Sequence, residues 1–179
     1  MTAESKEEIL KYIDKSIKRV PDFPNPGVLF YDISAMLSDR YAWPLAISLM
    51  SKEMGNFNPD VVVGIDARGF IFAAPLSINH GCGMALVRKK GKIPGETFAQ
   101  EYSLEYGHNT LELSKLSIKE GQKVVIVDDL LATGGTALAT IDLIEKAGGV
   151  VTGVMFALEL KSFKAREKFK VPVYSLMSY

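Results

Sequence analysis

The residues best suited to chemistry follow an apolar run in the second half of the chain. Val124–Val127 leads directly into two adjacent carboxylates, Asp128 and Asp129. A loop rich in Gly and Thr, residues 130–136, comes next, and a helical pattern follows it. Ligands of open α/β sheets bind at the carboxyl ends of strands, and a helix N-terminus lined by small residues attracts phosphate. The segment therefore predicts an anion site.

The paired carboxylates indicate a second ligand group. Asp128 and Asp129 could simply cap the following helix, but neighbouring carboxylates repel each other and need a shared partner. The vicinal hydroxyls of a ribose would supply one, and Thr133 and Thr136 add hydroxyl donors for the phosphate. We therefore predict a phosphate-and-sugar site. The loop lacks the Gly-Lys-Ser/Thr ending of a Walker A motif.

Basic residues follow two other predicted strands. Arg68 lies between a strand end and Gly69, where a lone guanidinium suits an anion better than open solvent. A second group occupies 88–92, namely Arg88, Lys89, Lys90 and Lys92. Such a run is usually a solvated face. Opposite a highly charged substrate, we expect one or two of its members to bind pyrophosphate oxygens.

Alternating strands and helices predict an α/β fold with a parallel sheet flanked by helices. The predicted strands cover 61–65, 84–87, 123–127, 150–158 and 171–176. The predicted helices cover 5–18, 39–54, 69–80, 136–147 and 162–169. Prolines exclude a helix over 21–27. The stretch 89–120 is polar and less regular, with one candidate strand at 110–113, and is expected to be a functional lid.

Composition narrows the class of protein. The 179 residues suit one compact domain over 1–179. Lys plus Arg balance Asp plus Glu at 21 each, so net charge indicates neither nucleic acid nor a membrane surface. No apolar run is long enough to span a bilayer. The single cysteine excludes an intramolecular disulfide and fits a reducing compartment, so we expect a cytoplasmic protein.

Four segments carry a resemblance to a known family. Residues 124–136 resemble the phosphoribosyl-pyrophosphate motif of type I phosphoribosyltransferases. Residues 23–30, 64–70 and 102–107 resemble the adenine phosphoribosyltransferases in particular. The resemblance implies the type I phosphoribosyltransferase fold. An N-terminal helix and hood would occupy about 1–34, and a flexible catalytic loop would lie within about 89–120.

The resemblance also implies roles for individual residues. The catalytic set would be Glu105, Asp128, Asp129 and Arg68. Phosphoribosyl pyrophosphate and AMP would contact Asp66, Ala67, Arg68, Arg88, Lys89, Lys92, Tyr106, Asp128, Asp129, Ala132, Thr133, Gly134, Gly135 and Thr136. Adenine would contact Leu29, Phe30, Tyr31 and Leu130. Family members carry Arg where this chain has Tyr31, so the resemblance supports a backbone role there.

The implied reaction joins adenine to phosphoribosyl pyrophosphate and gives AMP and pyrophosphate. Magnesium would be held mainly by the substrate, because His80 and His108 lack zinc spacing and hard oxygen ligands suit Mg²⁺. A homodimer is implied as well. Glu105 would donate or relay the proton at N7 of the purine ring.

Two alternatives remain at this point. A 6-oxopurine phosphoribosyltransferase usually has Asp where this chain has Ala132, and uses a Lys after a later strand, a position that Lys161 could fill. Ala132 and the hood motif argue against it. The second alternative is a regulator of the same fold that binds phosphoribosyl pyrophosphate without turnover.

Overall fold

A computed structural model describes residues 3–104 and 107–179. The chain consists of two compact units, residues 1–49 and residues 50–179. The expectation of one domain over 1–179 stays a prediction. None of the described helices is both long and apolar enough to cross a bilayer.

The first unit is a short hairpin with helices on either side of it in the sequence. Its elements are α1 (Ala3–Lys15), β1 (Lys18–Val20), β2 (Phe30–Asp32), α2 (Ser34–Ser38) and the first part of α3 (Ala42–Met54). The helix predicted over 5–18 ends three residues earlier than expected. It stops at Lys15 because Ser16 and Ile17 donate to Ile13 and Asp14 in tighter i to i−3 turns.

The helix predicted over 39–54 also begins later than expected. The Asp39 carboxylate accepts hydrogen bonds from the backbone N–H groups of Tyr41 and Ala42, both at 2.8 Å. These two bonds lower the pKa of Asp39. Asp39 is therefore the cap of α3 rather than its first residue, and Pro44 lies in the first turn, where proline is tolerated.

The proline-rich segment between β1 and β2 contains no helix, as its prolines predicted, and forms a turn. Val20 pairs with Phe30 in the antiparallel hairpin. Inside the turn, Phe23 N–H donates to the Val28 carbonyl at 3.2 Å, and Gly27 N–H donates to the Asp22 carboxylate at 2.7 Å. Gly27 has φ +84°, a conformation that glycine adopts without a Cβ penalty.

The second unit contains the main sheet and its helices. Its elements are η1 (Gly55–Phe57), β3 (Val61–Ile65), α4 (Gly69–His80), β4 (Gly83–Lys89), β5 (Thr97–Leu104), β6 (Gly107–Ser114), β7 (Lys123–Leu131), α5 (Gly135–Lys146), β8 (Val150–Glu159), η2 (Lys161–Phe163), η3 (Ala165–Lys168) and β9 (Val173–Ser178). Across the described residues the sheet order is β5-β6-β4-β3-β7-β8-β9.

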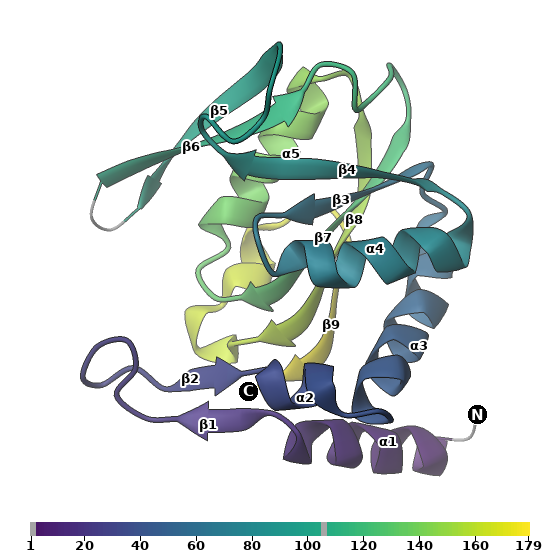
Figure 1. The fold of residues 1–179 in the computed structure, drawn as a ribbon, viewed down its shortest axis with the longest axis vertical. Coiled ribbons are helices and arrows are strands. Elements are labelled where there is room, and N and C mark those ends of the chain that lie inside the picture. Colours follow the sequence, from purple (N-terminus) through teal and green to yellow (C-terminus); the bar gives the residue numbers. More distant parts are fainter. Residues whose placement is uncertain (1–2, 105–106) are drawn as a thin grey trace. The chain divides into compact units, whose positions relative to one another are not determined.

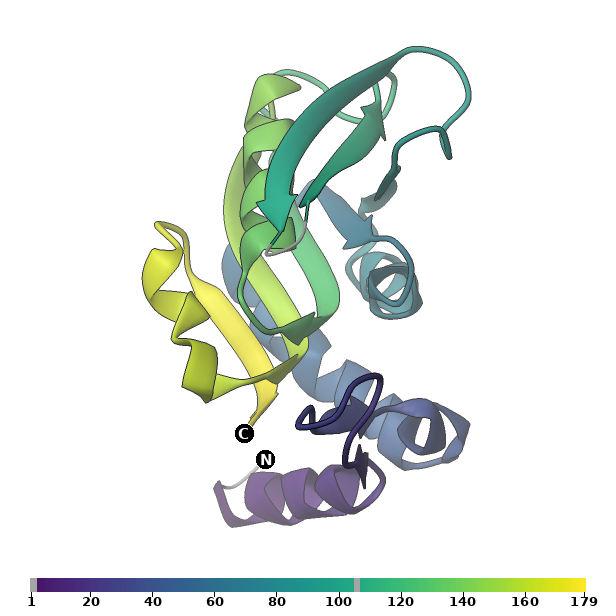
Figure 2. The same cartoon turned by 90° about the vertical axis from the view of Figure 1, so that its left-hand side faces the viewer.

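The centre of this sheet is parallel, as predicted. β3 pairs in parallel with β4 and β7, and β8 pairs in parallel with β7 and β9. All five residues of β3 are buried, which explains its continuous β-branched run. Helices α4 and α5 cover opposite faces of the sheet (Figures 1 and 2). The α/β fold expected from the sequence, a parallel sheet flanked by helices, is confirmed at the centre of the sheet.

The stretch 89–120 is more regular than the sequence predicted. β5 and β6 are eight-residue antiparallel strands that form a hairpin, and β6 pairs antiparallel with β4 (Figure 1). The candidate strand at 110–113 is the half of β6 whose Leu111 and Leu113 point into the core. The prediction of an irregular segment was wrong because β5 gains its regularity from a partner strand.

The end of the chain also differs from the prediction. Residues 162–169 form two 3₁₀ turns, η2 and η3, instead of one short helix. Lys164 separates them with φ +48°, which interrupts a continuous helix. β9 then begins at Val173 rather than at 171.

Candidate active site

The strand order reverses between β3 and β7, and a hollow opens there. The chain leaves β3 through α4 toward β4, whereas it leaves β7 through α5 toward β8 on the other side. Such a switch point is where open α/β sheets bind ligands. The hollow has a volume of about 370 Å³. Its lining comes from both strand ends: Ile65, Asp66, Ala67, Arg68, Asp128, Asp129, Leu130 and Thr136.

The two predicted carboxylates lie at the end of β7. Asp129 is only 8% exposed, and its backbone N–H donates to the Asp128 carboxylate at 2.9 Å. Burial raises the pKa of Asp128 well above its usual range, and the charge of Asp129 raises it further. Arg68 acts in the opposite direction. The pair therefore concentrates negative charge that a hydroxyl-bearing or cationic ligand would relieve.

Two arginines connect the strand ends around this hollow. Arg68 donates through Nε to the Asp129 carboxylate, and Arg88 Nε donates to the Asp66 carboxylate at 3.2 Å. Asp66 and Ala67, which follow β3, are joined by a cis peptide bond. The structure thus brings Asp66, Ala67 and Arg68 to one wall of the hollow, and their role as a pyrophosphate loop stays a prediction.

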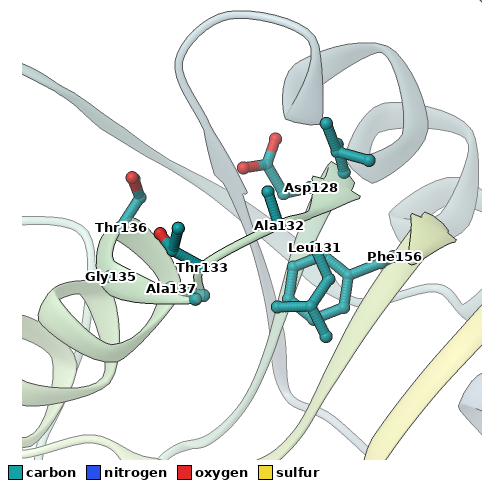
Figure 3. Close-up of a pocket in the computed structure, with 10 residues that line it drawn as sticks. Asp128, Leu131, Ala132, Thr133, Gly135, Thr136, Ala137 and Phe156 are labelled. Carbon is teal, nitrogen blue, oxygen red and sulfur yellow. The ribbon is translucent and has the colours of Figure 1, made fainter. Parts of the chain in front are cut away.

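The predicted phosphate loop, residues 132–136, lines a second small hollow beside the first. Gly134 precedes α5 with φ +84°, and the first α5 hydrogen bond runs from Leu138 N–H to the Gly134 carbonyl. The N–H groups of the first helical turn therefore have no acceptor within the helix. Figure 3 shows the Thr133 and Thr136 hydroxyls at this turn, with Asp128 at the strand end. The arrangement suits a phosphate dianion.

Glycine at position 69 lets α4 begin beside the end of β7. A Cβ on Gly69 would lie 2.7 Å from the Val127 carbonyl oxygen and 3.0 Å from an Asp128 carboxylate oxygen. Real side chains do not approach so closely, so any larger residue would displace the helix start or the strand end. Gly69 therefore determines the spacing between Arg68 and the two carboxylates.

The basic residues predicted at 88–92 lie at the end of β4 and in the turn that follows it: Arg88 and Lys89 end the strand, and Lys90 and Lys92 lie in the turn. Arg88 is held by Asp66, and its Nη1 donates to the Lys92 carbonyl at 3.2 Å. Glu112 on β6 accepts the Gly91 N–H at 2.8 Å and is nearly buried. Lys89, Lys90 and Lys92 are exposed. The turn is thus anchored by acids while its lysines face solvent.

The adenine-contacting residues predicted in the hood lie in the first unit. Phe30 and Tyr31 belong to β2, and Leu29 immediately precedes it. Phe30 packs edge-on against Phe23 with ring centroids 5.1 Å apart. Their role with adenine stays a prediction. Leu130, the fourth predicted residue, lines both hollows in the second unit.

Glu105 and Tyr106 lie outside the described residues. Their predicted roles therefore rest on the sequence. The flanking part of the hairpin does reach the phosphate loop, because the Thr136 hydroxyl donates to the Tyr102 hydroxyl at 3.4 Å.

Sequence reasoning missed three side chains that contact the site from a distance in the chain. They are Tyr102 at Thr136, Glu112 at Gly91, and Lys168 at the Thr133 carbonyl. Each contact joins residues at least 21 positions apart. A tyrosine, a glutamate and a lysine in polar segments carry no local pattern that distinguishes them from solvated residues.

The described residues contain no group of three or more His, Cys, Asp or Glu side chains placed to hold a metal ion. The carboxylates nearest the hollow are Asp66, Asp128 and Asp129, and arginines pair with two of them. A metal ion would need further oxygen ligands from a substrate or from water.

Comparison with known proteins confirms the type I phosphoribosyltransferase fold that the sequence resemblance implied. The phosphoribosyl transferase domain family matches residues 43–170. An adenine phosphoribosyltransferase of Rhodospirillum rubrum is 50% identical over 163 residues, which cover 91% of this chain and 95% of that protein. The crystal structure of adenine phosphoribosyltransferase from Rhodothermus marinus has a TM-score of 0.91 and 40% identity, covering 97% of this chain and 99% of that one. The Saccharomyces cerevisiae enzyme, solved with adenine and an imino-altritol bisphosphate, has a TM-score of 0.91 and 33% identity, covering 95% and 99%.

Proposed function

The chain belongs to the adenine phosphoribosyltransferases, and we propose which of its residues bind each part of the substrates and which take part in the reaction. The enzyme transfers the phosphoribosyl group of phosphoribosyl pyrophosphate to adenine. The bond between C1′ and the pyrophosphate oxygen breaks, and a bond between C1′ and adenine N9 forms. AMP and pyrophosphate leave the site.

The observation that carries this proposal is the paired carboxylates immediately before the phosphate loop. Asp128 and Asp129 accept hydrogen bonds from the ribose hydroxyls. The loop 132–136 receives the 5-phosphate through backbone N–H groups and the Thr133 and Thr136 hydroxyls. A ribose 5-phosphate spans the two adjoining hollows, which share Asp128, Leu130 and Thr136.

The pyrophosphate lies along the opposite wall. Asp66, Ala67 and Arg68 line that wall, and Arg68 supplies a planar guanidinium that can bind an anion through two N–H groups. Arg88, Lys89 and Lys92 add positive charge at the next strand end. These cations stabilise the charge that develops on the leaving group.

As the leaving group departs, C1′ gains oxocarbenium character. The carboxylates of Asp128 and Asp129 stabilise this cation through the ribose. The family resemblance assigns the purine proton to Glu105 and a contact with the substrate to Tyr106. It assigns contacts with the base to Leu29, Phe30, Tyr31 and Leu130, and a ring such as Phe30 can stack on a flat purine.

Magnesium fits this donor set when the substrate supplies most of the ligands. The adjacent Asp128 and Asp129 offer two carboxylates rather than a cage, which suits an ion that retains water and phosphate oxygens. When bound, the ion supplies positive charge beside the pyrophosphate. We also propose a homodimer, which the family resemblance implies, and a cytoplasmic location, which the single cysteine favours. Light scattering after gel filtration tests the first, and cell fractionation tests the second.

A substrate assay tests the proposed function. The purified protein is incubated with phosphoribosyl pyrophosphate, magnesium and one base, which is adenine, hypoxanthine or guanine. AMP should form readily, and IMP and GMP only in traces. Omitting magnesium should abolish turnover. Comparable turnover of a 6-oxopurine would contradict the base assignment, and binding without any product would favour the non-catalytic regulator.

A further inference from the structure

The phosphate loop 132–136 contains no charged side chain of its own. A phosphate dianion there would depend on backbone N–H groups, two hydroxyls and the N-terminal dipole of α5. The structure brings one cation to this loop from elsewhere in the chain. Lys168 Nζ, on η3, donates to the Thr133 carbonyl oxygen at 3.0 Å.

The contact has a consequence for the next peptide group. The Thr133 carbonyl and the Gly134 N–H belong to one trans peptide plane, in which C=O and N–H point in opposite directions. By binding the carbonyl, Lys168 holds that plane so that the Gly134 N–H points away from the lysine. That N–H is one of the donors available at the loop that opens α5.

The turn that carries Lys168 is packed firmly against the loop. A Cβ added to Gly134 would lie 3.3 Å from both the Ala165 Cβ and the Phe169 ring. Ala165 is buried, and Phe169 packs edge-on against Phe156 with centroids 6.3 Å apart. The approach of Lys168 to Thr133 therefore comes from a supported backbone rather than from a loose surface segment.

An ion pair between a partly exposed arginine and a buried glutamate anchors the same turn to the sheet. Arg166 binds Glu159, which is 5% exposed and lies at the end of β8, and also donates to the Ser175 hydroxyl at 3.1 Å. The Arg166 hydrogen bond lowers the pKa of Glu159. Glu159 pairs in register with Leu131, the residue before the phosphate loop. The anchor of η3 and the start of the loop are thus neighbours in the sheet.

We propose that Lys168 is a positioning residue of the 5-phosphate site, which orients the Thr133–Gly134 peptide by binding the Thr133 carbonyl oxygen. This inference rests on the proposed function, since it assigns a support to the same loop. No residue of η3 lines either hollow, so Lys168 would act on the phosphate through the Thr133–Gly134 peptide.

The test is the reverse reaction, from AMP and pyrophosphate, because only AMP carries the 5-phosphate. We compare wild type with K168M, K168R and the control K170M, which removes one exposed lysine charge two residues away. K168M should raise the KM for AMP about 5- to 10-fold, because it removes the charge-assisted hydrogen bond from Lys168 to the Thr133 carbonyl at a solvent-exposed position. It should leave the KM for pyrophosphate and kcat within about 2-fold of wild type. K168R should recover most of the loss, and K170M should match wild type.

Three results would overturn the proposal, and each differs from failure of the proposed function. These are an unchanged KM for AMP in K168M, an equal rise of both KM values in K168M, and a K170M variant that matches K168M. If wild type itself forms no adenine from AMP and pyrophosphate, the function assignment fails instead. Thermal unfolding of every variant identifies general destabilisation. K168Q, with a shorter neutral side chain, replaces K168M if that variant does not fold.

Discussion

Arg68 and Asp129 lie 61 positions apart in the sequence and form an ion pair across the hollow between β3 and β7. Asp129 is buried, whereas about half of the Arg68 side chain remains exposed. The guanidinium is therefore held by a buried carboxylate while its side chain stays partly exposed at the hollow. This pair couples the proposed pyrophosphate wall to the proposed ribose site.

Replacing Arg68 should weaken phosphoribosyl pyrophosphate binding far more than adenine binding. Arg68→Ala removes a charge-assisted contact worth about 1.5–3 kcal/mol, so we expect an affinity loss of roughly 10- to 100-fold. Isothermal titration with each ligand measures the difference. Unchanged affinity for phosphoribosyl pyrophosphate would mean that Arg68 only balances the charge of Asp129.

Each carboxylate variant should fold and lose most of its activity. Asp128→Asn and Asp129→Asn preserve shape, and Asn at 128 retains an oxygen that accepts the Asp129 N–H. They remove negative charge near the developing cation, so kcat should fall on the order of 100-fold or more. Steady-state kinetics beside circular dichroism separates catalysis from folding. Near-wild-type turnover in both variants would contradict the ribose role.

The raised pKa of Asp128 predicts an effect of pH on stability. A carboxyl group with a folded pKa above its unfolded value of about 3.9 holds its proton more tightly in the folded state. Its contribution to stability is fully present below the unfolded pKa and is lost as pH rises through the folded pKa. Asp128→Asn cannot ionise, so it should be more stable than wild type at neutral pH.

Urea unfolding at several values between about pH 4 and pH 8 tests this sign, since one pKa unit corresponds to about 1.4 kcal/mol. The stability advantage of Asp128→Asn should grow as pH rises and shrink as pH falls. A variant that is less stable than wild type at neutral pH would show that the ionised Asp128 is a stabilising group in the folded enzyme.

Glu105→Gln should reduce kcat while phosphoribosyl pyrophosphate affinity stays nearly intact. A general acid or base typically contributes on the order of 100- to 10,000-fold in rate. Glu101, exposed on the neighbouring strand β5, provides the matched control, and Glu101→Gln should have little effect. Kinetics in both directions measure this. A Glu105→Gln enzyme with full kcat in each direction would place the proton route elsewhere.

Gly69→Ala should destabilise the protein and damage the site together. The added methyl would lie 2.7 Å from the Val127 carbonyl, and relieving such overpacking costs about 1–3 kcal/mol. Gly55→Ala is a suitable control, because its Cβ would meet nothing closer than 3.9 Å. Denaturant midpoints for both variants give the comparison. Equal midpoints would show that α4 shifts freely.

Patterns along the chain determined the central part of the fold. The continuous apolar runs of β3, β7 and β8 predict buried parallel strands, because a strand covered on both faces has no polar side. The bounds of α4 were predicted residue for residue, since Gly81 ends the helix with φ +62°. The Asp128–Asp129 pair and its glycine-rich loop located the site, because a strand end, two carboxylates and a helix start are adjacent in sequence.

Tertiary structure alone decided the features that depend on distant partners. β5 is an edge strand stabilised by its pairing with β6, so its own residues give a weak signal. The contacts of Arg68 with Asp129, Arg166 with Glu159 and Lys168 with Thr133 join different elements of the fold. The position of Arg68 between a strand end and Gly69 indicated an anion site but not its partner Asp129, whereas Arg166 and Lys168 have the local pattern of any exposed basic residue. Which one binds a ligand or a loop depends on where the folded backbone places it, and that placement is a property of the whole sheet.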